Sequence, residues 1–505
     1  MDSARIIATV IFVGSIILLG DAWLKKDQSL VPESLPTTDL QQGISTVPEA
    51  TINDQSNKRS EEALNKAAPT LGDYVQVSTD VFSAKIDRLG GGIKELILTQ
   101  HHSKDSKSDA LRFFEIEAGR TYIAESGLIG EGLPNHNTQF ISKDSEYLLR
   151  TGEDSISVVL SSDTKNAFVE KIYTFYRGSY ALDVDYKITN KTNMPITPNA
   201  YFQLLRDGGD ADGDTKLQPT YTGGAVYSEE SKFKKVAFKD MDRAKVNYPK
   251  IVNDGWVGFV QHYFVAAWLP EEGKTRENFM KSLGNNLYAM GYVEGGTEIS
   301  ANREGTLGAR LYAGPQEQNV LKKLAPGLDL VVDYGWLTII ASPLFWLLSA
   351  IQGIVGNWGW AIVVLTVIIK LVFFPLSAAG YKSMAKMRVM APRLKTLKET
   401  YGDDKQKFQQ AMMDLYKKEK INPLGGCLPI LIQIPFFIAL YWVLLASVEL
   451  RDAPFIFWIT DLSAKDPYYV LPILMALSMV AQSWLSPTPP DPIQAKVMKV
   501  MPVVF

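Results

Sequence analysis

Long apolar runs alternate with polar loops through the last third of the chain. Three of these runs are complete, at residues 358–379, 427–448 and 467–485, and a further run begins at 497–505. Each complete run is close in length to the roughly 20 residues with which a helix crosses a hydrocarbon core. The pattern predicts an α-helical transmembrane core over residues 357–505. Because the last run stops within a span, we expect the C-terminal remainder of this core to be missing.

The chain also begins with an apolar run, from Ile6 to Gly20, and a long polar stretch follows it. No small-x-small cleavage site follows the run, which favours a retained signal anchor at residues 1–26 over a cleaved signal peptide. Residues 27–70 are rich in Ser, Thr, Pro, Gln and Asn and show no hydrophobic periodicity. They are therefore expected to form a flexible polar linker.

Short alternating segments fill residues 71–330, with turn residues between them. Examples are YVQVSTDVFSAKID at 74–87 and YALDVDYKITN at 180–190, and Gly90, Gly91 and Gly92 form one of the breaks. Many closely spaced segments of period two predict a large antiparallel β-sandwich. The chain has a single cysteine, so this domain is expected to be stabilised by its own core and not by disulfides.

Residues 331–356 are strongly apolar but are interrupted at Ser342 and Pro343, and Tyr334 and Trp336 lie near their start. Aromatic residues at one end and a central proline favour an amphipathic helix in the membrane interface. A full membrane crossing is the alternative. If these residues crossed the membrane, the N-terminal anchor would have to invert or be cleaved. We therefore favour the interfacial interpretation.

Basic residues gather between the first two complete spans. Residues 380–421 contain eleven basic and five acidic residues, a formal charge of +6, whereas the whole chain carries −3. Apolar residues recur there at close to a helical period, with a break at Gly402 and Asp404, which predicts a helical hairpin. Its positive charge places the hairpin in the cytoplasm. The N-terminus then lies in the cytoplasm as well, and residues 71–330 lie outside the membrane.

Lys370 lies inside the first complete span, where a charge costs about 2.5–3.5 kcal/mol on insertion scales. Thr366 lies one turn earlier on the same helical face, and Gln433 is a polar residue of the next span. The spans 427–448 and 467–485 contain no Asp or Glu. Two interpretations of Lys370 remain open at this point: its stem snorkels to the headgroups, or it lies in a hydrated cavity.

Few features of the sequence indicate an enzyme. The four histidines show no metal-ligand spacing, and no phosphate-binding GxxxxGK[ST] motif is present. The acidic run at 207–214 lacks the register of a calcium loop and its final glutamate. We therefore expect neither a cofactor nor a metal, and no catalytic residues.

Several strings in the last third resemble one family. SMAKM at 383–387, NPLGG at 422–426 and DPYY at 466–469 occur in that order. With the surrounding spans they resemble the YidC-type membrane protein insertases of Gram-negative bacteria, closely over residues 330–505. The anchor, the linker and the β domain complete the same architecture at lower specificity.

The resemblance implies a multi-domain protein of the bacterial inner membrane, with a periplasmic β-supersandwich and a multi-pass core. It implies a hydrophilic groove with one positive charge, which Lys370 supplies where the family usually has arginine. Lysine keeps the charge but loses the bidentate fork of arginine. We expect the substrate groove to be lined by Lys370, Thr366, Gln433, Pro435 and Cys427.

The resemblance also implies partners. Nascent membrane proteins would be the substrates, with membrane lipids around them and the secretion translocon as a companion, and no specific nucleic-acid sequence would be recognised. The hairpin would contact the ribosome or the signal-recognition receptor through Tyr381, Lys382, Lys386 and Arg388, besides setting the topology. Two other classes are weighed against the insertase: a secondary transporter that uses Lys370, and a carbohydrate-acting enzyme tethered to the membrane.

Overall fold

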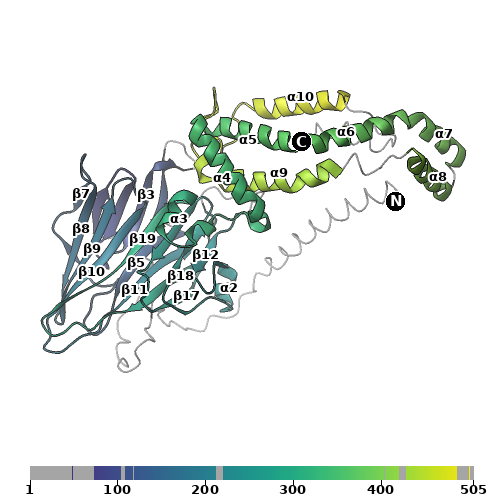
Figure 1. Ribbon diagram of the computed structural model, residues 1–505. Coiled ribbons are helices and arrows are strands. Elements are labelled where there is room, and N and C mark those ends of the chain that lie inside the picture. The colour runs from purple at the N-terminus through teal and green to yellow at the C-terminus, as the bar shows by residue number, and fades with distance from the viewer. Residues whose placement is uncertain are drawn as a thin grey trace, which may run out of the picture. The chain divides into compact units, whose positions relative to one another are not determined.

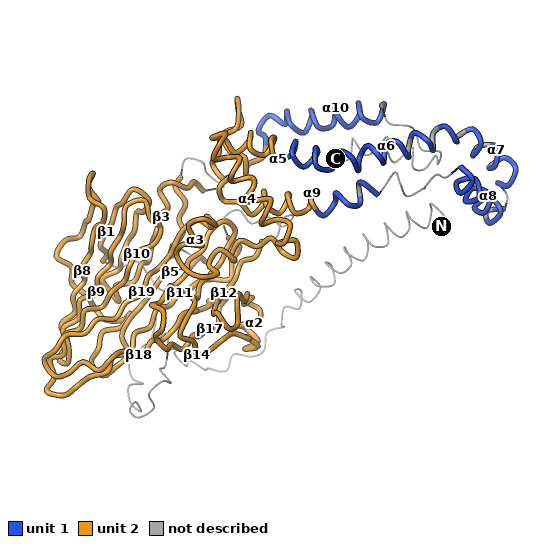
Figure 2. Tube along the Cα trace, viewed as in Figure 1, with its two compact units in different colours: residues 1–42, 366–435, 466–505 blue, residues 43–365, 436–465 orange. Residues whose placement is uncertain are grey.

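The computed structural model describes residues 48, 73–103, 109–117, 119–211, 220–402, 404–419, 428–485 and 500. The predicted anchor at 1–26, all of the predicted linker except Pro48, Cys427 and the final predicted span except Val500 lie outside these residues. The chain divides into two compact units (Figure 2). The β unit comprises residues 43–365 and 436–465, and the helical unit comprises residues 1–42, 366–435 and 466–505.

The described strands of the β unit form two sheets (Figure 1). The larger sheet has ten strands in the spatial order β14-β17-β18-β11-β5-β4-β3-β2-β1-β7. Its members are β1 (Tyr74–Ser78), β2 (Phe82–Asp87), β3 (Ile93–His102), β4 (Ala110–Glu117), β5 (Arg120–Ile129), β7 (Glu146–Leu148), β11 (Asn199–Asp207), β14 (Ile251–Val252), β17 (Arg276–Gly284) and β18 (Leu287–Gly295). Among these strands, only β1 and β7 pair in parallel.

The second sheet has nine described strands in the order β13-β12-β15-β16-β19-β10-β9-β8-β6, and its neighbours are antiparallel. They are β6 (Ile141–Ser142), β8 (Ser155–Asp163), β9 (Ala167–Tyr176), β10 (Ala181–Asn190), β12 (Gly223–Tyr227), β13 (Lys234–Val236), β15 (Trp256–Gln261), β16 (Phe264–Leu269) and β19 (Glu304–Pro315). The prediction of a large antiparallel β-sandwich is confirmed as far as a large β domain of two sheets, in which every described pairing of named strands except β1–β7 is antiparallel.

Period-two alternation explains why these segments form strands. In β9 every second residue, from Ala167 to Phe175, is buried, and the residues between them are partly exposed. Successive side chains of a strand point to opposite faces, so this pattern gives the strand one core face. Lys171 belongs to that core face, which makes it a charged residue in an apolar row.

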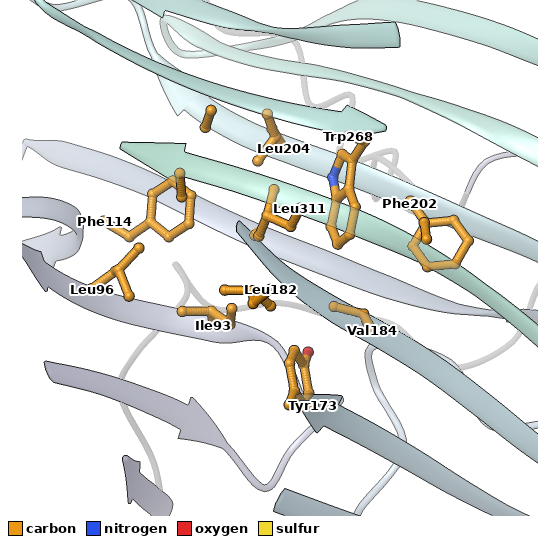
Figure 3. Packing of buried hydrophobic residues seen from close by; sticks show 14 of the residues in the cluster. Ile93, Leu96, Phe114, Tyr173, Leu182, Val184, Phe202, Leu204, Trp268 and Leu311 are labelled. Atoms are coloured by element: carbon orange, nitrogen blue, oxygen red, sulfur yellow. The ribbon is translucent and has the colours of Figure 1, made fainter. Parts of the chain in front are cut away.

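One continuous hydrophobic core draws side chains from both sheets (Figure 3). Phe202 of the larger sheet lies against Trp268 of the smaller sheet, with ring centroids 5.1 Å apart. Leu96 and Phe114 on one side and Leu182 on the other are fully or almost fully buried in the same cluster. Burying a side chain of this size contributes about 1.5–3 kcal/mol. This core is large enough to hold the domain together without a disulfide.

Gly90 shows why a glycine turn follows β2. Its φ is +81°, and an added Cβ would lie 2.0 Å from the carbonyl oxygen of His136. The turn therefore requires both a left-handed backbone and a close approach of two chains, which glycine permits. The turn also brings the carbonyl groups of Gly90 and Gly91 towards the interior.

The described helices and 3₁₀ turns are α2 (Phe238–Asp242), α3 (Gln318–Leu324), η1 (Leu328–Val331), η2 (Gly335–Leu337), α4 (Thr338–Val355), α5 (Trp358–Val372), α6 (Phe374–Val389), α7 (Ala391–Tyr401), α8 (Lys405–Lys418), α9 (Leu428–Ala446), η3 (Val448–Leu450) and α10 (Val470–Leu485). α4 continues through Pro343, where the sequence suggested an interruption. A proline in the second turn removes one hydrogen bond to the carbonyl four residues back, and α4 tolerates this loss.

The predicted span 358–379 is two helices and not one. α5 ends at Val372, α6 begins at Phe374, and the two axes differ by 57°. Pro375 explains the break, since it has no N–H to donate to the carbonyl of Leu371. Beyond the break the ladder resumes, with the Ser377 N–H donating to the Phe373 carbonyl at 2.9 Å.

Among the described residues, one helical stretch, Gly335–Val355, is long and apolar enough to cross a membrane. The bent pair Trp358–Val372 and Phe374–Ser383 is a second if it is counted as one span, and Leu431–Ala446 and Val470–Trp484 are shorter apolar stretches. Length and composition do not distinguish a helix that crosses the membrane from one that lies in the interface. The interfacial placement of residues 331–356 therefore stays a prediction.

Candidate functional site

The candidate site is built on α5, an almost entirely apolar helix. Ala361, Leu365 and Ile369 recur every four residues and are buried, which gives α5 one packed face. Thr366 and Lys370 lie one turn apart on a neighbouring face, where Thr366 is partly buried and Lys370 is exposed. Their shared face follows from the helical spacing, and their role in a groove stays a prediction.

Gln433 of α9 is the second polar element of the site. Its side chain is only 8% exposed, and its amide donates a hydrogen bond to Ser377 Oγ of α6 at 3.0 Å. The structure thus joins two helices of the helical unit through polar side chains, within segments that are otherwise apolar. Sequence reasoning identified Gln433 but missed Ser377. The sequence signal that could have identified Ser377 is that it is a single hydroxyl residue in an apolar run, seven residues after Lys370.

Pro435 adds a backbone group to the same region. It lies inside α9 and is partly buried. Because proline lacks an N–H, the carbonyl of Leu431 loses its usual helical donor. Pro375 has the same effect on the carbonyl of Leu371. Such carbonyls accept hydrogen bonds from water or from a polar peptide, and a membrane segment can hold them only where a partner is present.

Exposed apolar side chains surround these polar groups. Val367 and Leu371 of α5 are 52% and 66% exposed, and Leu431 of α9 is 58% exposed. α10 also presents a large apolar surface, and Trp484 near its end is 84% exposed. Apolar surfaces of this extent are rare in water-soluble monomers. Lipid is the natural environment for helices of this kind, with aromatic residues near their ends.

The predicted contact residues of the hairpin lie along α6. Tyr381 is 65% exposed, and Lys382 and Lys386 are exposed as well. Arg388 lies one residue before the end of α6, and its side chain is outside what the structure describes. These residues therefore follow one another along a single helix beyond the bend at Phe373.

α7 and α8 complete the hairpin. Arg393 of α7 and Glu419, which follows α8, form an ion pair at 2.7 Å. Asp404 is the N-cap of α8, and its carboxylate accepts hydrogen bonds from the backbone N–H groups of Gln406 and Lys407. The hydrogen bonds from Lys407 lower the pKa of Asp404. The helix break therefore lies at the capping position that the sequence indicated.

A second candidate is a buried polar cluster inside the β unit. Lys94 and Glu125 form an ion pair, Gln203 donates to Glu125 at 3.0 Å, and Lys171 Nζ donates to the carbonyl groups of Gly90 and Ser126, each at 3.2 Å. His136 Nδ1 contacts the hydroxyl of Tyr201. Sequence analysis missed this cluster because its members come from strands far apart in the chain.

The electrostatics of the cluster follow from its burial. Burial lowers the pKa of Lys171 to about 7, although Glu125 opposes this shift. Burial also lowers the pKa of His136. Burial alone would raise the pKa of Glu125, but Lys94, His136 and the hydrogen bonds together lower it to about 2. The charged groups of the cluster thus have protein partners, as buried charges in a stable core require.

No metal centre is built by the residues the structure describes, where no three His, Cys, Asp or Glu side chains gather. The chemistry available at α5, α6 and α9 is instead that of a cation, two hydroxyls, an amide and freed carbonyls. These groups can solvate a polar peptide segment, and they offer no nucleophile activated by a base.

Comparisons with known proteins agree with this division. A family model described as the YidC periplasmic domain matches residues 74–347, and one described as the 60Kd inner membrane protein matches residues 350–505. A "Membrane protein insertase YidC" of Methylobacillus flagellatus is 51% identical over 100% of this chain and 92% of its own. Proteins of the same name from Aromatoleum aromaticum and Nitrosospira multiformis are each 48% identical, with the same two shares covered.

Among solved structures, a galactose mutarotase related enzyme from Lactobacillus acidophilus is 10% identical. It covers 48% of this chain and 97% of its own, with a TM-score of 0.32, a likeness too distant to bear on function. The β domain, the apolar helices and the matched families define an inner-membrane protein with a periplasmic domain. The chain belongs to the YidC family of membrane protein insertases.

Proposed function

We propose that the chain inserts nascent membrane proteins into the inner membrane through a hydrophilic groove that carries the charge of Lys370. The observation that carries the proposal is the set of polar groups on otherwise apolar helices. Thr366 and Lys370 lie on one face of α5, and Gln433 bonds to Ser377 between α9 and α6. The relatives are named for insertion and not for a catalytic reaction, which supports a function without covalent chemistry.

Polar groups inside the membrane would hydrate part of a substrate segment. A cation with neighbouring hydroxyls and freed carbonyls lowers the cost of moving a polar, acidic segment part of the way across the bilayer. The apolar segment of the same substrate then leaves sideways into lipid, where its burial contributes about 25 cal/mol per Å². Lysine keeps the attraction for an acidic segment even though it lacks the fork of arginine.

The topology belongs to the same proposal. The basic hairpin at 380–421 is cytoplasmic, the N-terminus is cytoplasmic, and residues 71–330 are periplasmic. Tyr381, Lys382 and Lys386 are exposed along α6, which suits contact with a ribosome or a signal-recognition receptor. The protein acts alone or with the secretion translocon, and lipids surround the apolar faces of α5, α9 and α10.

Reconstitution tests this function directly. The purified full chain is placed in lipid vesicles, and a single-span reporter with a short acidic tail is synthesised in their presence. We expect the protease-protected, membrane-spanning fraction of the reporter to rise several-fold over that of protein-free vesicles, with no ion gradient imposed. A protected fraction equal to that of protein-free vesicles contradicts the proposal. Gradient-driven uptake of a small solute, with no protected reporter, would favour the secondary transporter.

A further inference from the structure

The connection between α9 and α10 is docked onto the β strands. α9 ends at Ala446, although the predicted span ran to residue 448, and the chain from this end to Lys465 lies within the β unit. We call Ser447–Asp452 the latch segment. Ser447, Val448 and Leu450 are 1%, 3% and 3% exposed, and Val448 belongs to the same core cluster as the strands of the two sheets. The latch segment therefore completes the core of the β domain.

Polar contacts fix the latch segment on both sides. The guanidinium of Arg451 donates to the carbonyl of His102 at the end of β3 and lies 5.7 Å and 5.4 Å from the ring centroids of Tyr263 and Phe264. Just before the segment, the carbonyl of Leu445 accepts a hydrogen bond from His262 Nε2 at 3.2 Å. These contacts come from the end of β3 in one sheet and from the β15–β16 hairpin in the other, so docking requires both folded sheets.

Glu449 lies in the middle of this docked segment. Its Oε2 is buried and has no hydrogen-bond partner among the described residues. Its own N–H and that of Gln318 favour the ionised carboxylate, whereas the facing carboxyl of Glu317 disfavours it. Tyr334 is the other titratable group that faces it. The remaining charged or titratable groups at the latch segment are His101, His102, His262, Tyr263, Arg451, Asp452 and Asp461.

Burial and the proximity of Glu317 raise the pKa of Glu449 to about 7. A carboxyl that loses burial returns towards its ordinary value near 4.5. The undocked segment therefore gives up its proton at a lower pH than the docked segment does. Docking is tightest below the lower value, weakens as the pH rises through the window between the two, and is then constant.

We propose that the latch segment is a pH-sensitive device, which holds the connection between α9 and α10 firmly on the β domain while Glu449 is protonated and loosens when Glu449 ionises. The device lies on the face that the proposed topology exposes to the periplasm. It does not depend on how a substrate is inserted, so it stands or falls separately from the proposed function.

Hydrogen exchange of the full chain in lipid nanodiscs tests the proposal. The peptide over residues 447–453 is followed at pH 5 and pH 7.5, with rates corrected for intrinsic exchange. The Arg451 N–H bonds to the Val448 carbonyl at 2.9 Å, so this peptide reports the docked state. We expect its protection factor to fall about 50-fold between the two pH values in the wild-type chain. In Glu449→Gln, which keeps the shape but cannot ionise, we expect no such fall.

Glu146→Gln, the same change at an exposed position of β7, is the matched control and should retain the wild-type pH dependence. A wild-type protection factor that is equal at both pH values overturns the proposal. So does an equal fall in the wild type and in Glu449→Gln, since the histidines nearby would then carry the effect.

Discussion

The amide of Gln433 donates a hydrogen bond to Ser377 Oγ at 3.0 Å and so joins α9 to α6. The two residues are 56 positions apart in the chain, and both lie in the helical unit. Gln433 is buried, so the hydrogen bond satisfies a polar group that is costly to leave unpaired in an apolar setting. It also lies just beyond the bend that follows Lys370. The pair therefore holds α9 and α6 together shortly after Lys370, the residue whose charge is proposed to act on the substrate.

A double-mutant cycle measures this link. We expect Ser377→Ala and Gln433→Leu each to lower the free energy of unfolding in detergent by about 1 kcal/mol. The double variant should lose clearly less than the two single losses combined, because it leaves no unpaired amide or hydroxyl. Strictly additive losses in a detergent-unfolding titration would contradict a direct bond between the two side chains.

The buried Lys171 predicts a pH dependence of the β domain. Burial lowers its pKa to about 7 in the folded state, whereas in the unfolded chain Lys171 stays protonated up to its ordinary value. Between these values the unfolded chain binds more protons, so stability rises with pH. From pH 7 to pH 9, Lys171 should add about 2 kcal/mol to the stability of the folded state.

Hydrogen exchange of the slowest amides of β9 and β10 measures this increase in the full chain. Lys171→Met, which has a similar length and no charge, should lack the Lys171 contribution. If the variant shows the same increase between pH 7 and pH 9 as the wild type, Lys171 is not the source.

Substitution of two glycines distinguishes the stability cost of backbone strain from the cost of a close steric contact. Gly90 and Gly152 both have positive φ, at +81° and +91°, but only the Cβ at Gly90 would meet another atom within 4 Å. Gly152→Ala should cost about 1 kcal/mol from its left-handed backbone. Gly90→Ala should cost more than about 3 kcal/mol, because the backbone of His136 must also move. Equal losses of stability in the two variants, measured by thermal unfolding, would refute the role of the close approach.

Charge reversal tests the ribosome contact on α6. In the double variant Lys382→Glu and Lys386→Glu, we expect ribosome co-sedimentation to fall at least about five-fold at low salt. The matched control reverses Lys417 and Lys418, which are exposed on α8 and change the net charge equally. The control should keep most of its binding. An equal loss in both double variants would show that the total charge of the hairpin matters and not the position on α6.

Local patterns in the sequence were sufficient to predict most of the architecture. The alternation in β9 predicts a strand, and the apolar runs predict α5, α9 and α10. The same alternation also places Lys171 on the core face. It cannot show that the carbonyl groups of Gly90 and Ser126 accept hydrogen bonds from Lys171, since these two residues come from the other sheet and its β2–β3 turn.

The site was predictable to the extent that it is local. The spacing of Thr366 and Lys370 places them on one face of one helix. Ser377 is a partner of Gln433 only through tertiary structure, so no helical period in the sequence reveals it. Val448 was assigned to a span by its apolar neighbours, yet it is buried in the β domain. A hydrophobic pattern shows that a residue is buried, but not whether lipid or protein covers it.

The central claim is that the charge of Lys370 acts electrostatically on the acidic part of a substrate. Insertion of a reporter with an acidic tail is compared for the wild type, Lys370→Arg and Lys370→Glu, in cells depleted of the native insertase. We expect Lys370→Arg to insert as well as the wild type, and Lys370→Glu to insert at least about ten-fold less, since the attraction becomes a repulsion. A reporter with a neutral tail should be affected far less. Equal insertion of the acidic reporter by all three proteins would contradict the account.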